Sequence, residues 1–289
     1  MNWFEGIILG LVQGLTEFLP VSSSGHLMIA REILGVDIPD GEAFLSFEVT
    51  VHAATVLATI VVFRRQILDL LRDLFRFRYN DGTDYILKIC VTMIPVFVVG
   101  MFFKDQVSAL FEGLKVVGYA LLATAVLLYL SDRFEKAPKA EDEAAEGSPV
   151  HGISGILTSG RGGISFLQAF IVGLAQAVAV IPGLSRSGST IATGLLCGAR
   201  RSDMAQFSFL MVLVPILGEA FLDLVGGGFA GSAASIGAPA LVLGFVAAFL
   251  SGLFSCKVMI ALVRKASLRW FALYCAIAGA AVLAFMYLK

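Results

Sequence analysis

Near its start the chain reads Gly10-Leu-Val-Gln13-Gly-Leu-Thr-Glu17-Phe-Leu-Pro20-Val-Ser22-Ser23-Ser24-Gly25-His26, inside sequence that is otherwise very apolar. A related stretch follows at an offset of 163 residues, Gly173-Leu-Ala-Gln176-Ala-Val-Ala-Val-Ile-Pro182-Gly-Leu-Ser185-Arg186-Ser187-Gly188-Ser189-Thr190. Polar, glycine-broken sequence of this kind is costly in hydrocarbon unless it lines a buried cavity. Two copies therefore predict one site built from two related halves.

The composition is that of an integral membrane protein. Of the 289 residues, 58% are hydrophobic and 15% are charged, whereas a soluble domain carries about 25% charged residues. The net charge of −1 gives no indication of nucleic acid binding. The four cysteines stand singly in apolar stretches, so neither a disulfide framework nor a thiolate metal site is predicted.

Six apolar segments are long enough to span a membrane, which takes about 20 helical residues. They are 44–63, 85–103, 115–131, 205–225, 238–256 and 270–288. Two further apolar regions, 3–34 and 166–199, are interrupted by proline, serine and glycine. A helix over residues 3–19 would be only about 25 Å long, short of a hydrocarbon core of about 30 Å. We predict that each region forms a re-entrant hairpin.

The predicted fold class is an all-α integral membrane protein with six transmembrane helices and two re-entrant helical hairpins in an inverted-topology repeat. Each half has one hairpin and three spans, and because three is odd the second half must enter from the opposite side. Residues 1–289 form a single membrane domain. Its parts are a first repeat (1–131), a cytoplasmic linker (132–165) and a second repeat (166–289). The acidic stretch Lys136–Pro149 of the linker is predicted to be disordered.

Basic residues predict the orientation. If the six spans alternate, sixteen basic residues lie on one side of the membrane and four lie on the other. The predicted loop 64–88 alone contributes six of the sixteen. The richer side should be cytoplasmic, which places both termini on the extracytoplasmic side. The chain is predicted to cross the membrane several times.

Ionisable residues within membrane segments are candidates for function. Gln13 and Glu17 are four residues apart and share a helix face. A turn over Pro20–Gly25 follows, and His26 is predicted to begin the second short helix. The free amide groups and the dipole of that helix start favour an anion.

The second hairpin predicts a parallel site, in which Thr190 begins the helix and Arg186 supplies a planar fork suited to two phosphate oxygens. Serines, glycine, a helix start and an arginine together predict a phosphate site. The residues predicted to bind the substrate are Gln13, Ser22, Ser24, Gly25, Ser185, Ser187, Gly188 and Thr190. Glu48 and His52, four apart on the first span, are either further cavity groups or a hydrogen-bonded polar pair between helices.

At these residues the chain resembles the bacterial undecaprenyl-diphosphate phosphatase family of the bacitracin-resistance type. The matching motifs are Gln13-Gly-Leu-Thr-Glu17, Pro20-Val-Ser-Ser-Ser-Gly-His26 and Pro182-Gly-Leu-Ser-Arg-Ser-Gly-Ser-Thr190. One departure is His52, at a position where glutamine is usual in the family. The resemblance covers essentially the whole chain.

The resemblance implies hydrolysis of undecaprenyl diphosphate to undecaprenyl phosphate and inorganic phosphate. This reaction recycles the lipid carrier for peptidoglycan synthesis and gives resistance to bacitracin. The resemblance also implies a divalent cation, Mg²⁺ or Ca²⁺, for which we expect Glu17, Gln13 and Glu48 as oxygen ligands. The expected partners of the protein are the substrate and membrane lipid, and a homodimer is left open. The resemblance also implies a location in the bacterial plasma (inner) membrane, with the catalytic cavity open to the extracytoplasmic side.

The predicted catalytic residues are Glu17, Ser23, His26 and Arg186. Three routes are open at this point: attack by Ser23 with His26 as its base or as the acid for the leaving group, attack by His26 through a phosphohistidine, or attack by metal-bound water.

Two other classes of protein compete with this interpretation. A type-2 phosphatidic-acid phosphatase would share Ser24-Gly25-His26, but it needs a histidine where this chain has Ala192. A secondary transporter or lipid-phosphate flippase would share the inverted repeat, and it would release no phosphate in detergent.

Overall fold

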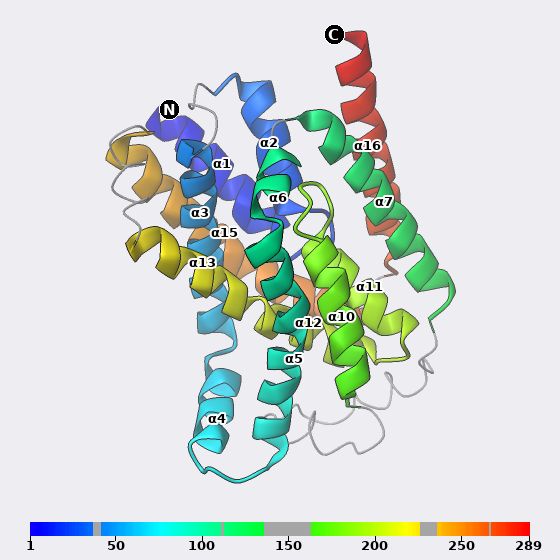
Figure 1. The fold of residues 1–289 in the computed structure, drawn as a ribbon. Helices are drawn as coiled ribbons and strands as arrows, with labels where there is room; N and C mark the ends of the chain where they lie inside the picture. Colours follow the sequence, from blue (N-terminus) through cyan, green and yellow to red (C-terminus); the bar gives the residue numbers. More distant parts are fainter. Residues whose placement is uncertain (37–41, 111–112, 136–162, 226–235, 266) are drawn as a thin grey trace.

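The computed structural model describes residues 1–36, 42–110, 113–135, 163–225, 236–265 and 267–289, and all regular structure in these ranges is helical (Figure 1). The helices are α1 (Trp3–Thr16), α2 (Ser23–Leu34), α3 (Glu42–Val62), α4 (Arg64–Leu74), α5 (Asp81–Phe102), α6 (Lys104–Leu110), α7 (Leu114–Arg133), α10 (Phe166–Val178), α11 (Arg186–Leu196), α12 (Arg201–Met211), α13 (Leu213–Val225), α15 (Ala238–Lys265) and α16 (Arg269–Leu288). The predicted disordered stretch Lys136–Pro149 lies outside the described residues.

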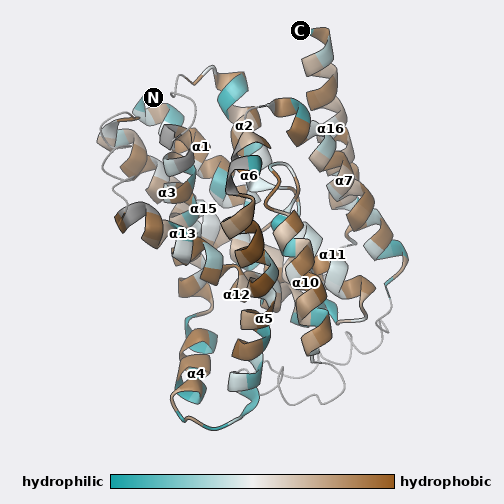
Figure 2. Ribbon diagram, viewed as in Figure 1, coloured by the Kyte–Doolittle hydropathy of each residue, from teal (hydrophilic) through white to brown (hydrophobic). Residues whose placement is uncertain are grey.

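The long helices confirm an all-helical protein of the multi-pass membrane class. Within the described residues, five helices are long and apolar enough to cross a membrane, namely α5, α7, α15, α16 and the run from α12 into α13. The count rises to six if α3 and α4, which meet at a bend of 79°, are taken as one span. Figure 2 shows hydrophobic residues along α5, α7 and α16, and many large apolar side chains on them are exposed, as lipid-facing surfaces require.

One local prediction was wrong. The segment predicted as the loop 64–88 contains helix α4, which turns sharply away from α3 at Phe63. The predicted span 205–225 corresponds to the apolar run from α12 into α13, which has a local break at Val212. Pro215 accounts for this break, because its ring clashes with the carbonyl four residues earlier, at Met211, and it has no amide proton to donate.

The two hairpins contain helices too short to span. The first is α1 and α2, the second is α10 and α11, and the longest of the four has 14 residues, about 21 Å at 1.5 Å per residue. Both second helices begin earlier than predicted, at Ser23 rather than His26 and at Arg186 rather than Thr190. The reason is that the preceding serine acts as the N-cap in each case.

Each hairpin packs on a long helix from the other half of the chain. Helix α1 lies along α15, and α10 lies along α5. The contact between α1 and α15 is close because α1 presents glycines to it, namely Gly6, Gly10 and Gly14. A Cβ atom added to Gly10 would lie only 2.2 Å from the carbonyl oxygen of Gly244. Small residues at this four-residue spacing allow helix backbones to approach in membranes. In addition, α7 pairs with α16, and both termini lie at the end of the bundle opposite α4 (Figure 1).

We predict that Gly10→Ala destabilises the protein, because the new methyl group forces α1 away from α15. Overpacking of this kind costs about 1–3 kcal/mol, and a drop of several degrees in the Tm of the purified protein should report it. Gly100→Ala in α5 is the matched control, since an added Cβ there meets open space. Equal Tm values for the two variants would contradict the close α1–α15 contact.

Candidate active site

The tips of the two hairpins meet in a reciprocal contact. A Cβ atom added to Gly25 would lie 3.0 Å from the Cα atom of Gly183, and one added to Gly188 would lie 3.2 Å from the Cβ atom of Pro20. The repeat offset of 163 relates Pro20 to Gly183 and Gly25 to Gly188, so the two contacts correspond to each other. The hydroxyl of Ser187 also donates across the junction to the carbonyl of Leu19, at 3.0 Å.

The backbone of each tip is held by serine caps. Ser22 has φ 71°, and its hydroxyl accepts from the amide of Gly25 at 3.3 Å. Ser185 accepts from the amide of Gly188 at 3.0 Å. Helix α7 holds the second tip, because Thr124 accepts from the amide of Ser185 at 3.1 Å. The positive φ of Ser22 is uncommon for a residue with a side chain and is typical of strain retained at functional sites.

Glu17 is the centre of a hydrogen-bonded group at the first tip. Its Oε2 accepts a hydrogen bond from the side-chain Nε2 of Gln13 at 2.7 Å and another from the hydroxyl of Ser23 at 2.6 Å. The Nε2 atom of His52 lies 3.4 Å from the same oxygen. Gln13 and Glu17 share a helix face as predicted, and the turn brings Ser23 back onto the carboxylate.

His52 contacts both its own helix and the carboxylate of the first tip. Its Nδ1 lies 2.8 Å from the main-chain carbonyl of Glu48, and its Nε2 faces Glu17. Because carbonyl and carboxylate oxygens only accept, the doubly protonated imidazolium satisfies both contacts. Glu48 is buried, and its carboxylate is close enough to His52 and Arg186 to interact electrostatically with both.

Arg186 brings positive charge to this group from the second tip. Its guanidinium lies close enough to Glu17, Glu48 and His52 to interact electrostatically with all three. Its Nη1 atom is buried and has no hydrogen-bond partner among the described residues.

Other buried polar atoms of the hairpins are also unpartnered within the described structure. They are Gln13 Oε1, Gln176 Oε1 and Ser189 Oγ. A buried polar group without a partner costs about 1–3 kcal/mol, and in a native protein it calls for a ligand or bound water. The unpartnered atoms therefore offer hydrogen-bonding positions for a polar ligand or for bound water.

His26 lies outside the group around Glu17. It stands one turn into α2, where Nδ1 is 2.7 Å from the carbonyl of Ser22 and Nε2 is 2.6 Å from the hydroxyl of Tyr274 on α16. The hydroxyl of Ser23 therefore contacts Glu17 and not His26. The sequence analysis missed Tyr274, because a tyrosine in an apolar span carries no local signal of function.

The remaining predicted substrate residues fall into two sets. Ser22 and Ser24 at one tip and Ser185 and Ser187 at the other form equivalent hydroxyl pairs, 3.5 and 3.4 Å apart. Thr190 instead lies one turn inside α11, where its hydroxyl contacts that of Ser208 at 2.7 Å. Thr190 is fully buried, so its hydroxyl is used to pack α11 on α12.

Oxygen donors from the first hairpin and from α3 are of the type that a hard cation prefers. Glu17, Glu48 and the orphaned oxygen of Gln13 are oxygen donors, the type that Mg²⁺ and Ca²⁺ prefer. No group of three His, Cys, Asp or Glu side chains at metal-binding spacing occurs within the described residues. The protein would therefore supply few ligands, which suits Mg²⁺, since that ion keeps waters and takes further oxygens from substrate phosphates.

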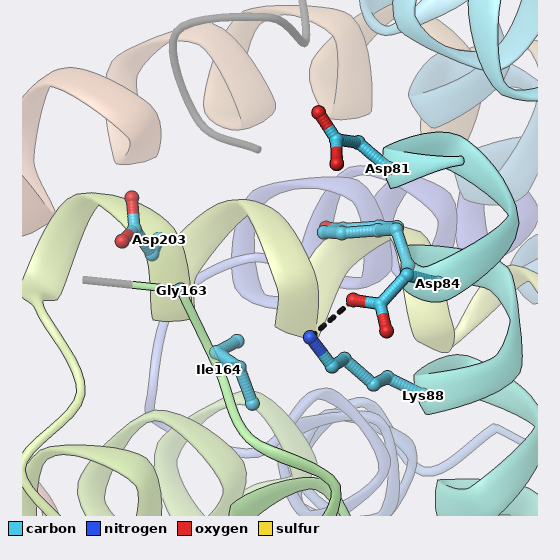
Figure 3. A pocket seen from close by; sticks show the side chains of 7 residues that line it. Asp81, Asp84, Lys88, Gly163, Ile164 and Asp203 are labelled. Atoms are coloured by element: carbon cyan, nitrogen blue, oxygen red, sulfur yellow. Dashed lines mark hydrogen bonds and ion pairs between the residues drawn. The ribbon is translucent and has the colours of Figure 1, made fainter. Parts of the chain in front are cut away.

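A separate polar pocket lies between α5 and α12 (Figure 3). Asp84 and Lys88 form an ion pair in it, and Asp203 on its wall is paired with Arg200. None of the residues predicted for catalysis or binding lines this pocket, which is bounded by Asp81, Asp84, Tyr85, Lys88, Gly163, Ile164 and Asp203.

Comparison with known proteins identifies the family. The sequence profile of the family described as bacitracin resistance protein BacA matches residues 6–281. The chain belongs to this family. It is 49% identical over 288 residues to the undecaprenyl-diphosphatase of Bacteroides thetaiotaomicron, covering 98% of both chains. The undecaprenyl-diphosphatase of Parabacteroides distasonis is 49% identical with full coverage of both chains, and that of Christiangramia forsetii is 43% identical with 99% coverage.

We predict that Glu17→Gln lowers turnover by at least about a hundredfold, because an amide cannot accept the Ser23 proton in a reaction where proton transfer contributes about 10²–10⁴. Phosphate release by the purified variant, with its Tm as a check on folding, measures this. The control is Glu5→Gln, which alters an exposed capping box at the start of α1. Turnover within a few-fold of the native protein would remove Glu17 from the reaction.

Proposed function

We propose that this protein hydrolyses undecaprenyl diphosphate to undecaprenyl phosphate and inorganic phosphate. The activity recycles the lipid carrier for peptidoglycan synthesis and confers resistance to bacitracin. The family membership and the relatives' printed names support this function. The structural observation that supports it is the meeting of the hairpin tips, where Glu17 and Ser23 come from one tip and Arg186 from the other.

We propose a division of labour between the tips. The amide groups at the start of α11 and the guanidinium of Arg186 bind the diphosphate, since a planar fork and a helix start both favour phosphate oxygens. The amide groups at the start of α2 do the same at the first tip. Ser23 and Glu17 then act on the terminal phosphorus, with Gln13 and His52 holding the carboxylate.

The hydrogen bond from Ser23 to Glu17 favours Ser23 as the nucleophile. Ser23 Oγ attacks the terminal phosphorus and its proton passes to Glu17. The bond from phosphorus to the bridging oxygen breaks, and undecaprenyl phosphate leaves. Water then attacks the phosphoserine, Glu17 returns the proton to Ser23 Oγ, and inorganic phosphate departs.

A divalent cation, Mg²⁺ or Ca²⁺, completes this proposal. Glu17, Glu48 and Gln13 would hold it, and when bound it would neutralise charge on the diphosphate. The charge count supports it, because two carboxylates offset the cations Arg186 and His52. The cavity residues alone therefore leave little net positive charge for a diphosphate, whose reaction depends on charge neutralisation.

We also propose the finer topology, with six spans, two re-entrant hairpins and an inverted repeat. The packing of α1 on α15 and of α10 on α5 supports it. In each of these contacts, the first hairpin helix of one half packs on a long helix of the other half. The excess of basic residues near α4 supports a cytoplasmic position for that end of the bundle. The site would then open towards the extracytoplasmic side of a bacterial inner membrane, and reporter fusions at residue 289 test this orientation.

Phosphate release from farnesyl and undecaprenyl diphosphate by purified protein in detergent tests the function. We expect turnover of both substrates, its loss in a chelator, and its recovery on adding Mg²⁺ or Ca²⁺. Arg186→Gln should lower turnover by at least about a hundredfold through the lost clamp, whereas Arg72→Gln on exposed α4 should not. A native protein that releases no phosphate would favour a lipid-phosphate transporter.

Acid quenching during turnover identifies the nucleophile. We expect an acid-stable phosphoryl group on Ser23, found by mass spectrometry and absent from Ser23→Ala. An acid-labile group on His26 would assign the attack to the imidazole. A persistent absence of any phosphorylated residue in rapid-quench samples would favour direct attack by water.

A further inference from the structure

The ring of His26 is held at both nitrogens. The carbonyl of Ser22 lies 2.7 Å from Nδ1, and the hydroxyl of Tyr274 lies 2.6 Å from Nε2. The two rings are nearly parallel, with an interplanar angle of 12° and centroids 5.6 Å apart. One contact comes from the residue's own hairpin, and the other comes from a helix of the opposite half of the chain.

These contacts fix which nitrogen carries the proton. A carbonyl oxygen only accepts, so Nδ1 must be the protonated nitrogen. In the neutral ring Nε2 then presents its lone pair, and the Tyr274 hydroxyl donates to it. If Nε2 takes up a proton, the same hydroxyl accepts, because a phenol can act as either donor or acceptor. Tyr274 can therefore hold the ring in both protonation states.

Two contacts hold the chain after Tyr274 against the first hairpin. The thiol of Cys275 lies 3.6 Å from the carbonyl of Pro20, and Lys289 pairs with Glu32 at 2.9 Å. Tyr274 itself is 47% exposed, and its hydroxyl contacts the imidazole of His26. This contact indicates a role in the orientation of the imidazole.

We propose that Tyr274 is a positioning residue for His26, which sets the tautomer of the imidazole and the plane of its ring. The proposal rests on the proposed function, and on the prediction from the sequence that His26 acts as the acid for the leaving lipid phosphate. It adds a residue from α16, in the second half, to a site otherwise built from the hairpins and α3.

The first test is the kinetics of Tyr274→Phe, which keeps the ring and removes only the hydroxyl. We expect kcat for undecaprenyl diphosphate to fall about ten- to thirtyfold, a part of the 10²–10⁴ that proton transfer typically contributes. KM should stay within about twofold, because the hydroxyl acts on the imidazole and not on substrate binding. The matched control is Tyr119→Phe on α7, whose hydroxyl contacts only Tyr287 among the described residues, at 3.0 Å; it should keep native kcat.

The second test reads the ring directly and does not depend on turnover. The chain has only three histidines, so ¹⁵N-histidine labelling gives a simple NMR spectrum, in which His26→Gln assigns the signals of His26. In the native protein we expect a protonated Nδ1 and a hydrogen-bonded Nε2. In Tyr274→Phe the Nε2 signal should move to that of a free acceptor or of a mixture of tautomers, and in Tyr119→Phe it should be unchanged.

The outcomes separate this proposal from the function on which it rests. Unchanged kcat and unchanged His26 signals in Tyr274→Phe, in a native protein that is active, would overturn the positioning role alone. A kcat that falls without any change at His26 would also overturn it, since the hydroxyl would then act elsewhere. If the native protein released no phosphate, the proposed function would fail, and the NMR result would still decide whether Tyr274 sets the tautomer.

Discussion

The structure depends on the contact between two polar hairpin tips inside an apolar protein. A turn that leaves amide and carbonyl groups unpaired cannot be placed in hydrocarbon. Here each tip covers the other, through the reciprocal approach of Gly25 to Gly183 and of Gly188 to Pro20. The hydrogen bond from Ser187 to Leu19 closes the junction. Among the buried side-chain atoms of the described residues, Gln13 Oε1, Arg186 Nη1 and Ser189 Oγ stay without a partner, and a ligand can use them.

The same contact explains why the two halves have diverged. Once the tips are in contact, a group supplied by one half can act beside groups of the other. The first half supplies Glu17 and Ser23, and at the repeat position of Ser23 the second half has Arg186. Helix α3 adds His52, which contacts Glu17, and Glu48 nearby. The contact thus brings a carboxylate, a hydroxyl and an imidazole near a guanidinium, a combination that neither hairpin presents alone.

Much of this could be predicted from sequence, because the signals are local. Apolar length predicted the long helices, and the repeated motif predicted two hairpins with Gln13 and Glu17 on one helix face. The starts of α2 and α11 were misplaced by three or four residues. The sequence does not distinguish a serine in a turn from a serine that caps a helix, and only the hydrogen bonds of Ser22 to Gly25 and of Ser185 to Gly188 identify the caps. Helix α4 was missed because its charged face resembles a loop.

The sequence alone determined the membrane class, the two hairpins and the types of side chain at their tips. These follow from composition, spacing and the cost of polar groups in hydrocarbon, all of which act over a few residues. Only the tertiary structure decided which side chains meet. It placed Ser23 on Glu17 instead of His26, turned His52 towards the carboxylate, and brought Tyr274 to His26 from 248 residues away. Such pairings depend on how distant helices pack, and no local pattern in the chain encodes them.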